Sequence, residues 1–140
     1  MSKFAVEHLS DDRLADAWPV VCMSHSHANV EWWISEAAAV IGRGGGVLAA
    51  SALDGTIYGV ATYEVAKKAV LGRVLAVGTL VTFELSRRAP ARHALCDALD
   101  LLGHAFVCRS VVLPLPSKGH VEHRMKWLYG VRDFDSIQDG

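Results

Sequence analysis

The spacing of hydrophobic residues changes several times along the chain, and the first changes predict a strand followed by two helices. Residues 4–8 alternate between apolar and polar side chains, which is the period of a half-buried strand. Apolar residues then recur at helical spacing after Ser10, a residue type that often caps a helix N-terminus. Pro19 is expected to kink this helix or end it early. A second helix is predicted from about 29 to 41, with Gly42 as its stop.

Three β runs follow in the middle of the chain. Residues 47–53 and 56–65 read as strands, and the Asp-Gly pair at 54–55 between them is a strong hairpin signature. A third run at 73–85 extends the hairpin into an antiparallel meander. Gly78 interrupts that run, which indicates a bulge or a close approach of another backbone.

The last third of the chain predicts a helix between two parallel strands. Pro90 fits the first turn of this helix, and a short strand at 110–115 follows it. A helix at 119–128 and a strand at 134–137 complete the pattern. The predicted fold class is α/β (α+β). It is a mixed, mostly antiparallel sheet with helices on both faces, in the order β-α-α-β-β-β-α-β-α-β, within one domain over residues 1–140.

Composition fits one packed domain and narrows the class of partner. Hydrophobic residues make up 51% of the 140 residues, and the formal net charge of −1 gives no general attraction to nucleic acid or to an anionic membrane. The start of the sequence lacks the pattern of a signal peptide, and the apolar run at 74–83 is too short to span a bilayer as a helix. Three cysteines without CxxC spacing favour a reducing compartment, so we expect a cytoplasmic protein.

One stretch departs from this balance of charge. Six basic residues lie between 67 and 92, against the single carboxylate Glu84. They are Lys67, Lys68, Arg73, Arg87, Arg88 and Arg92. The stretch could meet an anionic ligand, or it could be an ordinary solvated surface.

The order of elements and three local matches resemble the GNAT acyltransferase superfamily, over nearly the whole chain. The segment 53–61 is similar to the family's central hairpin, "dG.ivG.a". Residues 81–84, followed by an arginine-bearing turn and a helix, resemble its "V.pe" strand and pyrophosphate loop. The segment 128–134 resembles its "lYeklGF". The resemblance implies transfer of an acetyl or small acyl group from acyl-CoA to an amine acceptor, with no metal.

The loop implied to bind the diphosphate of CoA differs from the family's Q/R-x-x-G-x-G/A pattern. Ser86, Ala89 and Ala91 stand at its three key positions, so both glycines are alanine. A helix N-terminus offers backbone N–H groups and a positive dipole end to phosphate, but Pro90 has no N–H to give. The nearby arginines could compensate, because guanidinium groups bind phosphate well. The implied cofactor-binding residues are Val81, Phe83, Arg87, Arg88, Ala89, Ala91 and Arg92.

The resemblance also implies roles in the chemistry. Tyr129 matches the tyrosine that protonates the leaving thiolate, and its other interpretation is a core tyrosine with a surface hydroxyl. Glu84 is the carboxylate nearest to the implied acyl end, where it could act as base, orient the amine, or simply face solvent. A backbone N–H of the strand that carries Val81 would hold the thioester carbonyl. Four residues are expected to line the acceptor site: His25, His27, Tyr63 and Glu64.

Other interpretations remain open from the sequence. The altered loop favours a GNAT-fold protein without catalysis that serves as a ligand-binding or assembly module. Two histidine pairs, at 25 and 27 and at 120 and 123, suggest a metal site, although zinc normally takes four ligands. A hydrolase nucleophile at Ser24 or Ser26 would lack the strand-turn-helix elbow that such serines occupy. The short C-terminal end leaves room for a partner strand, which makes a homodimer a further hypothesis.

Overall fold

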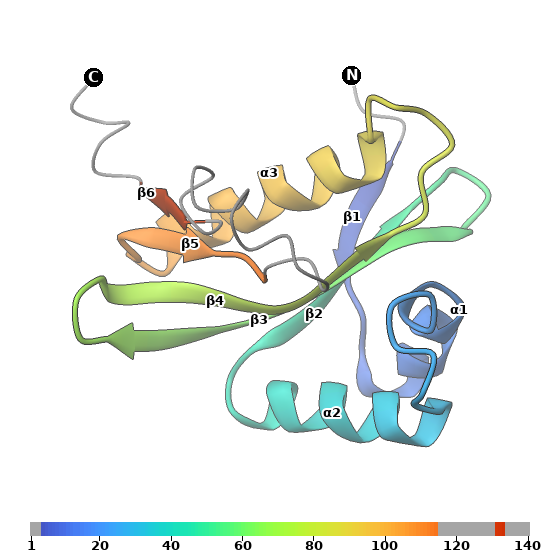
Figure 1. Ribbon diagram of the computed structural model, residues 1–140, viewed down its shortest axis with the longest axis horizontal. Coiled ribbons are helices and arrows are strands. Elements are labelled where there is room, and N and C mark those ends of the chain that lie inside the picture. Colours follow the sequence, from blue (N-terminus) through green and yellow to red (C-terminus); the bar gives the residue numbers. More distant parts are fainter. Residues whose placement is uncertain (1–3, 115–130, 134–140) are drawn as a thin grey trace.

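A six-stranded sheet organises the computed structural model, which describes residues 4–114 and 131–133 (Figure 1). The strands lie side by side in chain order, and all neighbours are antiparallel except β4 and β5, which are parallel. The strands are β1 (Ala5–His8), β2 (Gly46–Ser51), β3 (Ile57–Lys68), β4 (Gly72–Thr82), β5 (Ser110–Val112) and β6 (Val131–Asp133). The predicted mixed, mostly antiparallel sheet is therefore confirmed.

Helices cover both faces of this sheet, as predicted. A 3-10 helix, η1 (Asp11–Ala17), leads into α1 (Trp18–Val21) and α2 (Val30–Gly42) on one face, and α3 (Pro90–Ala105) lies on the other (Figure 1). Each face has its own core: Trp33 and Val60 are buried with the first group, and Leu95 and Leu75 are buried with α3. The sheet is the layer between these two cores because its strands place successive side chains on opposite faces.

The first helical segment differs from the prediction of a single helix capped by Ser10. The Ser10 hydroxyl makes no capping bond and donates instead to the Asp12 carboxylate at 2.5 Å. The segment is a 3-10 helix up to Ala17, and Pro19 lies in the first turn of the short helix α1. Proline is tolerated there because the first N–H groups of a helix have no partner within it.

The other element boundaries follow the local signals closely. The Asn29 side chain caps α2 by accepting from the Trp32 N–H at 2.8 Å. In the β2–β3 turn, the Asp54 carboxylate accepts from the Thr56 N–H at 2.9 Å, and Gly55 has a φ of 89°. Pro90 begins α3 as predicted.

After residue 114, the structure describes only residues 131–133. β5 pairs with β4 as expected, and β6 at 131–133 forms a strand where the sequence pattern predicts none. The predicted helix at 119–128 and the predicted strand at 134–137 lie outside the described residues. Across the part of the chain that is described, no helix combines the length and the apolar character that a membrane span requires.

Candidate functional site

The parallel pair of strands, β4 and β5, is short. Val74 to Ala76 of β4 pair with Ser110 to Val112 of β5, and β4 then continues to Thr82. Within residues 4–114 and 131–133, no strand pairs with this continuation on the β5 side. Among the described residues, the continuing half of β4 is therefore a free edge, along which an extended ligand could lie.

β4 carries a bulge at the start of this free edge. Val77 pairs with Tyr63 and Thr79 pairs with Thr62, so Gly78 is the additional residue on β4. The Thr79 N–H donates to the side-chain Oγ1 of Thr62 at 3.0 Å. A bulge changes the direction of backbone groups, and a hydroxyl acceptor can rotate to release the N–H to another acceptor. The predicted bulge at Gly78 is confirmed.

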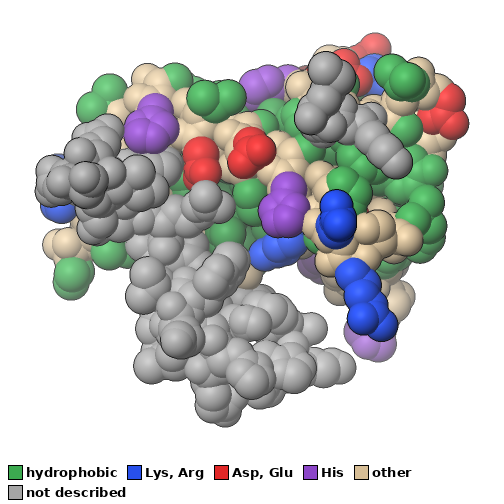
Figure 2. Space-filling view, turned by 90° about the horizontal axis from the view of Figure 1, so that it is seen from above, with side chains coloured by type: hydrophobic (Ala, Val, Ile, Leu, Met, Phe, Trp, Pro, Cys, Tyr) green, Lys and Arg blue, Asp and Glu red, His purple; other side chains and the backbone are tan. Residues whose placement is uncertain are grey.

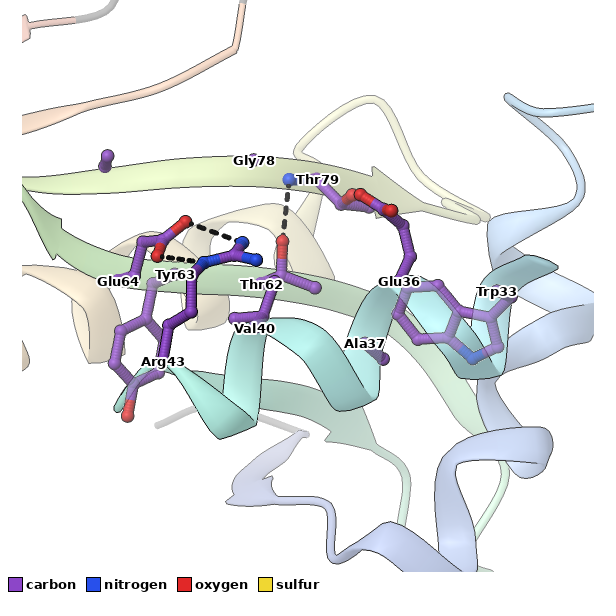
Figure 3. A pocket seen from close by; sticks show the side chains of 11 residues that line it. Trp33, Glu36, Ala37, Val40, Arg43, Thr62, Tyr63, Glu64, Gly78 and Thr79 are labelled. Carbon is purple, nitrogen blue, oxygen red and sulfur yellow. Dashed lines mark hydrogen bonds and ion pairs between the residues drawn. The ribbon is translucent and has the colours of Figure 1, made fainter. Parts of the chain in front are cut away.

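A cavity of about 140 Å³ lies between α2 and the sheet and reaches this bulge (Figure 3). Its lining comes from three elements: Trp33, Glu36, Ala37, Val40 and Arg43 from the segment of α2; Thr62, Tyr63 and Glu64 from β3; and Ala76, Gly78 and Thr79 from β4. The cavity therefore combines an apolar helix face with polar groups from both strands, which is typical of small-ligand sites.

Two charged groups close one end of this cavity. The Arg43 guanidinium donates to both carboxylate oxygens of Glu64, from Nε at 2.9 Å and from Nη2 at 3.1 Å. This hydrogen bonding holds the pKa of Glu64 below its ordinary value and raises the pKa of Arg43. Figure 3 shows the pair bridging α2 and β3, so the Glu64 charge is balanced within the cavity.

Tyr63 also contributes to the wall, but its hydroxyl reaches the other face of the sheet. There the hydroxyl lies 2.6 Å from Nε2 of His8, and the ring packs in the core with α3. Burial raises the pKa of Tyr63, so the phenol stays protonated at neutral pH.

The turn between β4 and α3 forms a second polar region, built around Glu84. The Glu84 carboxylate accepts from the Ala91 N–H at 3.2 Å and from the Arg92 N–H at 2.8 Å. Those donors belong to the first turn of α3, and Pro90 contributes none. Glu84 is therefore the cap of this helix, a role that the sequence did not reveal because the carboxylate comes from seven residues before Ala91.

Three further backbone donors, the N–H groups of Arg88, Ala89 and His93, also have acceptors within the fold. The Ser86 hydroxyl accepts from the Arg88 N–H at 3.0 Å, and the Ser86 carbonyl accepts from the Ala89 N–H at 3.1 Å. The His93 N–H donates to the Ala89 carbonyl at 3.0 Å. The side chains of Arg87 and Arg88 are exposed. On the face of the molecule drawn in Figure 2, basic side chains lie near one end of a row of acidic and histidine side chains.

The architecture can be compared with known proteins. No protein-family model matches the sequence, and no curated protein matches it. Solved structures do match. An aminoglycoside 6'-N-acetyltransferase from Acinetobacter baumannii has a TM-score of 0.73 at 14% identity, over 91% of this chain and 89% of that one. An acetyltransferase from Trypanosoma brucei has a TM-score of 0.66 at 17% identity, over 89% and 90%.

This chain has the GNAT fold. A further match is the aminoglycoside acetyltransferase AAC(6')-Iy in complex with a bisubstrate analogue of CoA, with a TM-score of 0.72 at 13% identity, over 92% of this chain and 90% of that one. The predicted fold is thus confirmed. Similarity at these low identities establishes the architecture, and function has to be argued from the site itself.

Ala89 is the residue that the sequence pattern places at the first loop glycine. Its φ of 49° and ψ of 57° are left-handed, a region that glycine adopts freely and alanine rarely. The turn therefore keeps a conformation suited to glycine, at a cost of about 1 kcal/mol for the Cβ atom.

The predicted site residues fall into three groups. Tyr63 and Glu64, two of the residues predicted to line an acceptor site, line the cavity at the bulge. The predicted cofactor residues gather at the end of β4 and the start of α3, where Val81 is buried and the half-exposed Phe83 ring stacks on Tyr58 at 6.2 Å. Tyr129 lies outside the described residues.

The third group is the loop before α2, which lines a different hollow. His25 stacks on Trp32 with ring centroids 5.1 Å apart, and His27 lies in the same loop. This hollow shares no lining residue with the cavity at the bulge. Within the described part of the chain, no group of three or more His, Cys, Asp or Glu side chains is placed to hold a metal ion.

Four polar or charged residues that line the cavity at the bulge were not predicted as site residues: Glu36, Arg43, Thr62 and Thr79. Only the isolated Gly78 gave a signal near them, because an interrupting glycine marks a bulge. The other contacts join segments far apart in the sequence, so no local pattern reports them.

Proposed function

We propose that this protein is an N-acyltransferase that moves an acetyl or small acyl group from acyl-CoA to a primary amine. The observation that carries the proposal is the bulge at Gly78, which lies between the free edge of β4 and the cavity under α2. An acyl donor along the strand and an amine in the cavity would meet there. Holding two reactants together removes much of the entropic cost of their encounter.

The acyl thioester would be activated by a backbone donor of β4. The Thr79 N–H donates to the Thr62 hydroxyl and not to a carbonyl of another strand, so a thioester carbonyl oxygen could replace that hydroxyl as its acceptor. A fixed N–H stabilises the negative charge that develops on this oxygen during attack. Val81 and Phe83 would contact the pantetheine arm, and Tyr129 stays our proposed acid for the leaving thiolate.

The phosphate groups of CoA would be held chiefly by guanidinium charge. Arg87 and Arg88 are exposed beside the start of α3. The backbone N–H groups of residues 88, 89, 91 and 92 donate to Ser86 and Glu84. Binding through the backbone would require these groups to exchange their present acceptors. We therefore expect weaker diphosphate binding than a glycine-rich loop gives.

This same observation favours the alternative function, a GNAT-fold module that has lost acyl-CoA. The Glu84 carboxylate supplies negative charge where a diphosphate would otherwise accept from the helix end. A module of this kind would keep the cavity at the bulge for a ligand and would carry out no transfer.

Titration of acetyl-CoA into the purified protein distinguishes the two functions. The acyltransferase predicts saturable binding that weakens about tenfold when Arg87 and Arg88 are both replaced by alanine, because each charge-assisted bond to phosphate contributes roughly 1.5–3 kcal/mol at best and less at an exposed site. The matched control replaces Lys67 and Lys68, which are exposed cations at the end of β3. No binding of acetyl-CoA at millimolar concentration would leave the module as the function.

A further inference from the structure

The cavity at the bulge holds more negative than positive charge. Glu36, Arg43 and Glu64 are its charged lining residues, which are two carboxylates and one guanidinium. Arg43 donates two hydrogen bonds to Glu64, so that carboxylate is already satisfied. The pKa of Arg43 is raised mainly by its hydrogen bonds to Glu64, and the charge of Glu36 adds only a small contribution. The carboxylate of Glu36 is therefore the one available to a cationic ligand.

We propose that Glu36 is a catalytic residue of the proposed acyl transfer, which binds the ammonium group of the acceptor and takes its proton. The proposal rests on the proposed function. Figure 3 shows the Glu36 carboxylate directed from α2 toward β4, on the side of the cavity where Thr79 lies. A base in this position would serve the amine next to the N–H that is proposed to polarise the thioester.

The other candidate carboxylates are committed elsewhere. Both oxygens of Glu84 accept backbone N–H groups at the start of α3. Both oxygens of Glu64 accept from Arg43, whose hydrogen bonding stabilises the ionised form. A carboxylate held in its ionised form by other donors is a poor proton acceptor. Glu36 is also exposed, so a proton that it receives can pass on to solvent.

The cavity also restricts the kind of amine. The cavity of about 140 Å³ is small beside the pockets of roughly 300–1,000 Å³ that enclose drug-sized ligands. Trp33, Ala37 and Val40 give the cavity an apolar wall, against which a short aliphatic chain can pack. We infer that the acceptor is a short-chain aliphatic primary amine.

The transfer step then balances in bonds and protons. The ammonium nitrogen gives one proton to the Glu36 carboxylate, and its freed electron pair attacks the carbonyl carbon of the thioester. A C–N bond forms and the C–S bond breaks. The second proton on nitrogen passes to the departing thiolate, and Glu36 releases the first proton to water. The products are an N-alkyl amide and the free thiol of CoA.

The test measures thiol release from acetyl-CoA with n-butylamine as the probe, for wild type, Glu36→Gln and Glu36→Asp. The control is Glu31→Gln, an exposed carboxylate on the first turn of the same helix that does not line the cavity. We expect Glu36→Gln to lower kcat/KM about 10²-fold at neutral pH. This loss of kcat/KM should become smaller as the pH is raised toward the pKa of the alkylamine, which is about 10.4 by analogy with lysine. At that pH much of the amine is already neutral when it binds. Glu36→Asp should recover part of the rate, and the dissociation constant of acetyl-CoA should not change.

Each contrary result has a distinct meaning. Equal rates for wild type and Glu36→Gln would overturn the role of Glu36 alone. A deficit that is the same at every pH, without recovery by Glu36→Asp, would assign Glu36 a structural role and also overturn the proposal. Binding of acetyl-CoA without turnover of n-butylamine would overturn the alkylamine assignment and leave the acyltransferase standing. Absence of both binding and turnover would remove the proposed function, and this inference with it.

Discussion

Gly45 lies where the chain leaving α2 passes closest to β3. A Cβ atom added there would lie 2.1 Å from the carbonyl oxygen of Tyr63 and 2.8 Å from Cγ1 of Val40. In the sequence Gly45 is one of three consecutive glycines at 44–46, but in the fold this position is defined by close contact with a backbone. This contact fixes the distance between α2 and β3, and thus the width of the cavity at the bulge.

Gly45→Ala should therefore destabilise the protein by about 3 kcal/mol, because the clash is with backbone and must move a strand or the helix end. The free energy of unfolding from denaturant titration measures this. The control is Gly42→Ala at the end of α2, where a Cβ would meet nothing within 4 Å. Alanine at this position should raise the free energy of unfolding by about 0.5 kcal/mol, because alanine is a better helix former than glycine. Equal stability of the two variants would contradict the predicted contact.

At the scale of elements, the start of α3 shows how a helix end is satisfied by a distant group. Its N-cap residue Ala89 makes no side-chain capping bond, and Pro90 lacks an N–H. Glu84 supplies the acceptors from the end of the preceding segment. Its negative charge also complements the positive end of the helix dipole. The helix is thus stabilised by the same group that competes with a diphosphate for its donors.

Glu84→Ala should cost about 1 kcal/mol of stability, the usual effect of losing a helix cap. The amides of Ala91 and Arg92 should also exchange with solvent deuterium faster than in wild type, because their acceptor is gone. Glu84→Gln keeps an acceptor oxygen and should lose only part of this stability. Unchanged exchange at both amides in Glu84→Ala would show that the carboxylate is not the cap.

For the whole molecule, the helix layer under the cavity is joined to the sheet by a long-range ion pair. Arg43 follows the end of α2 and Glu64 lies in the middle of β3, 21 residues further along the chain. Exposed pairs of this kind contribute little to stability, but this one is bidentate and fixes the geometry of one end of the cavity. Because the pair requires an ionised Glu64, its contribution to stability should depend on pH.

Arg43→Ala should lower stability slightly at pH 7, by much less than Gly45→Ala. The folded pKa of Glu64 lies below its ordinary value of 4.5, so the pair stabilises the fold above that value and is lost as the pH falls through the folded pKa. The difference between Arg43→Ala and wild type should disappear in that acidic range. Urea unfolding at neutral and acidic pH measures it, with Lys67→Ala as a control whose difference from wild type should not follow this titration. A constant difference for Arg43→Ala would contradict the pairing.

Local signals by themselves determined most of the elements and their order. The Asp-Gly turn at 54–55, the Asn29 cap, the bulge at Gly78 and Pro90 at the start of α3 each act through neighbours in the chain, so their pattern is visible in the sequence. Ser10 takes the N-cap position of the first helical segment, as predicted, but its hydroxyl donates to the Asp12 side chain and makes no bond to a backbone donor.

Only the tertiary structure decided the chemistry that the site can offer. It directed Glu84 to the end of α3, paired Glu64 with Arg43, and left Glu36 facing a cavity beside the bulge. These outcomes depend on contacts between α2, β3 and β4, whose side chains meet only when the sheet is assembled. A carboxylate has the same chemical structure wherever it occurs in a sequence. Its role depends on which hydrogen-bond donors contact it in the folded chain.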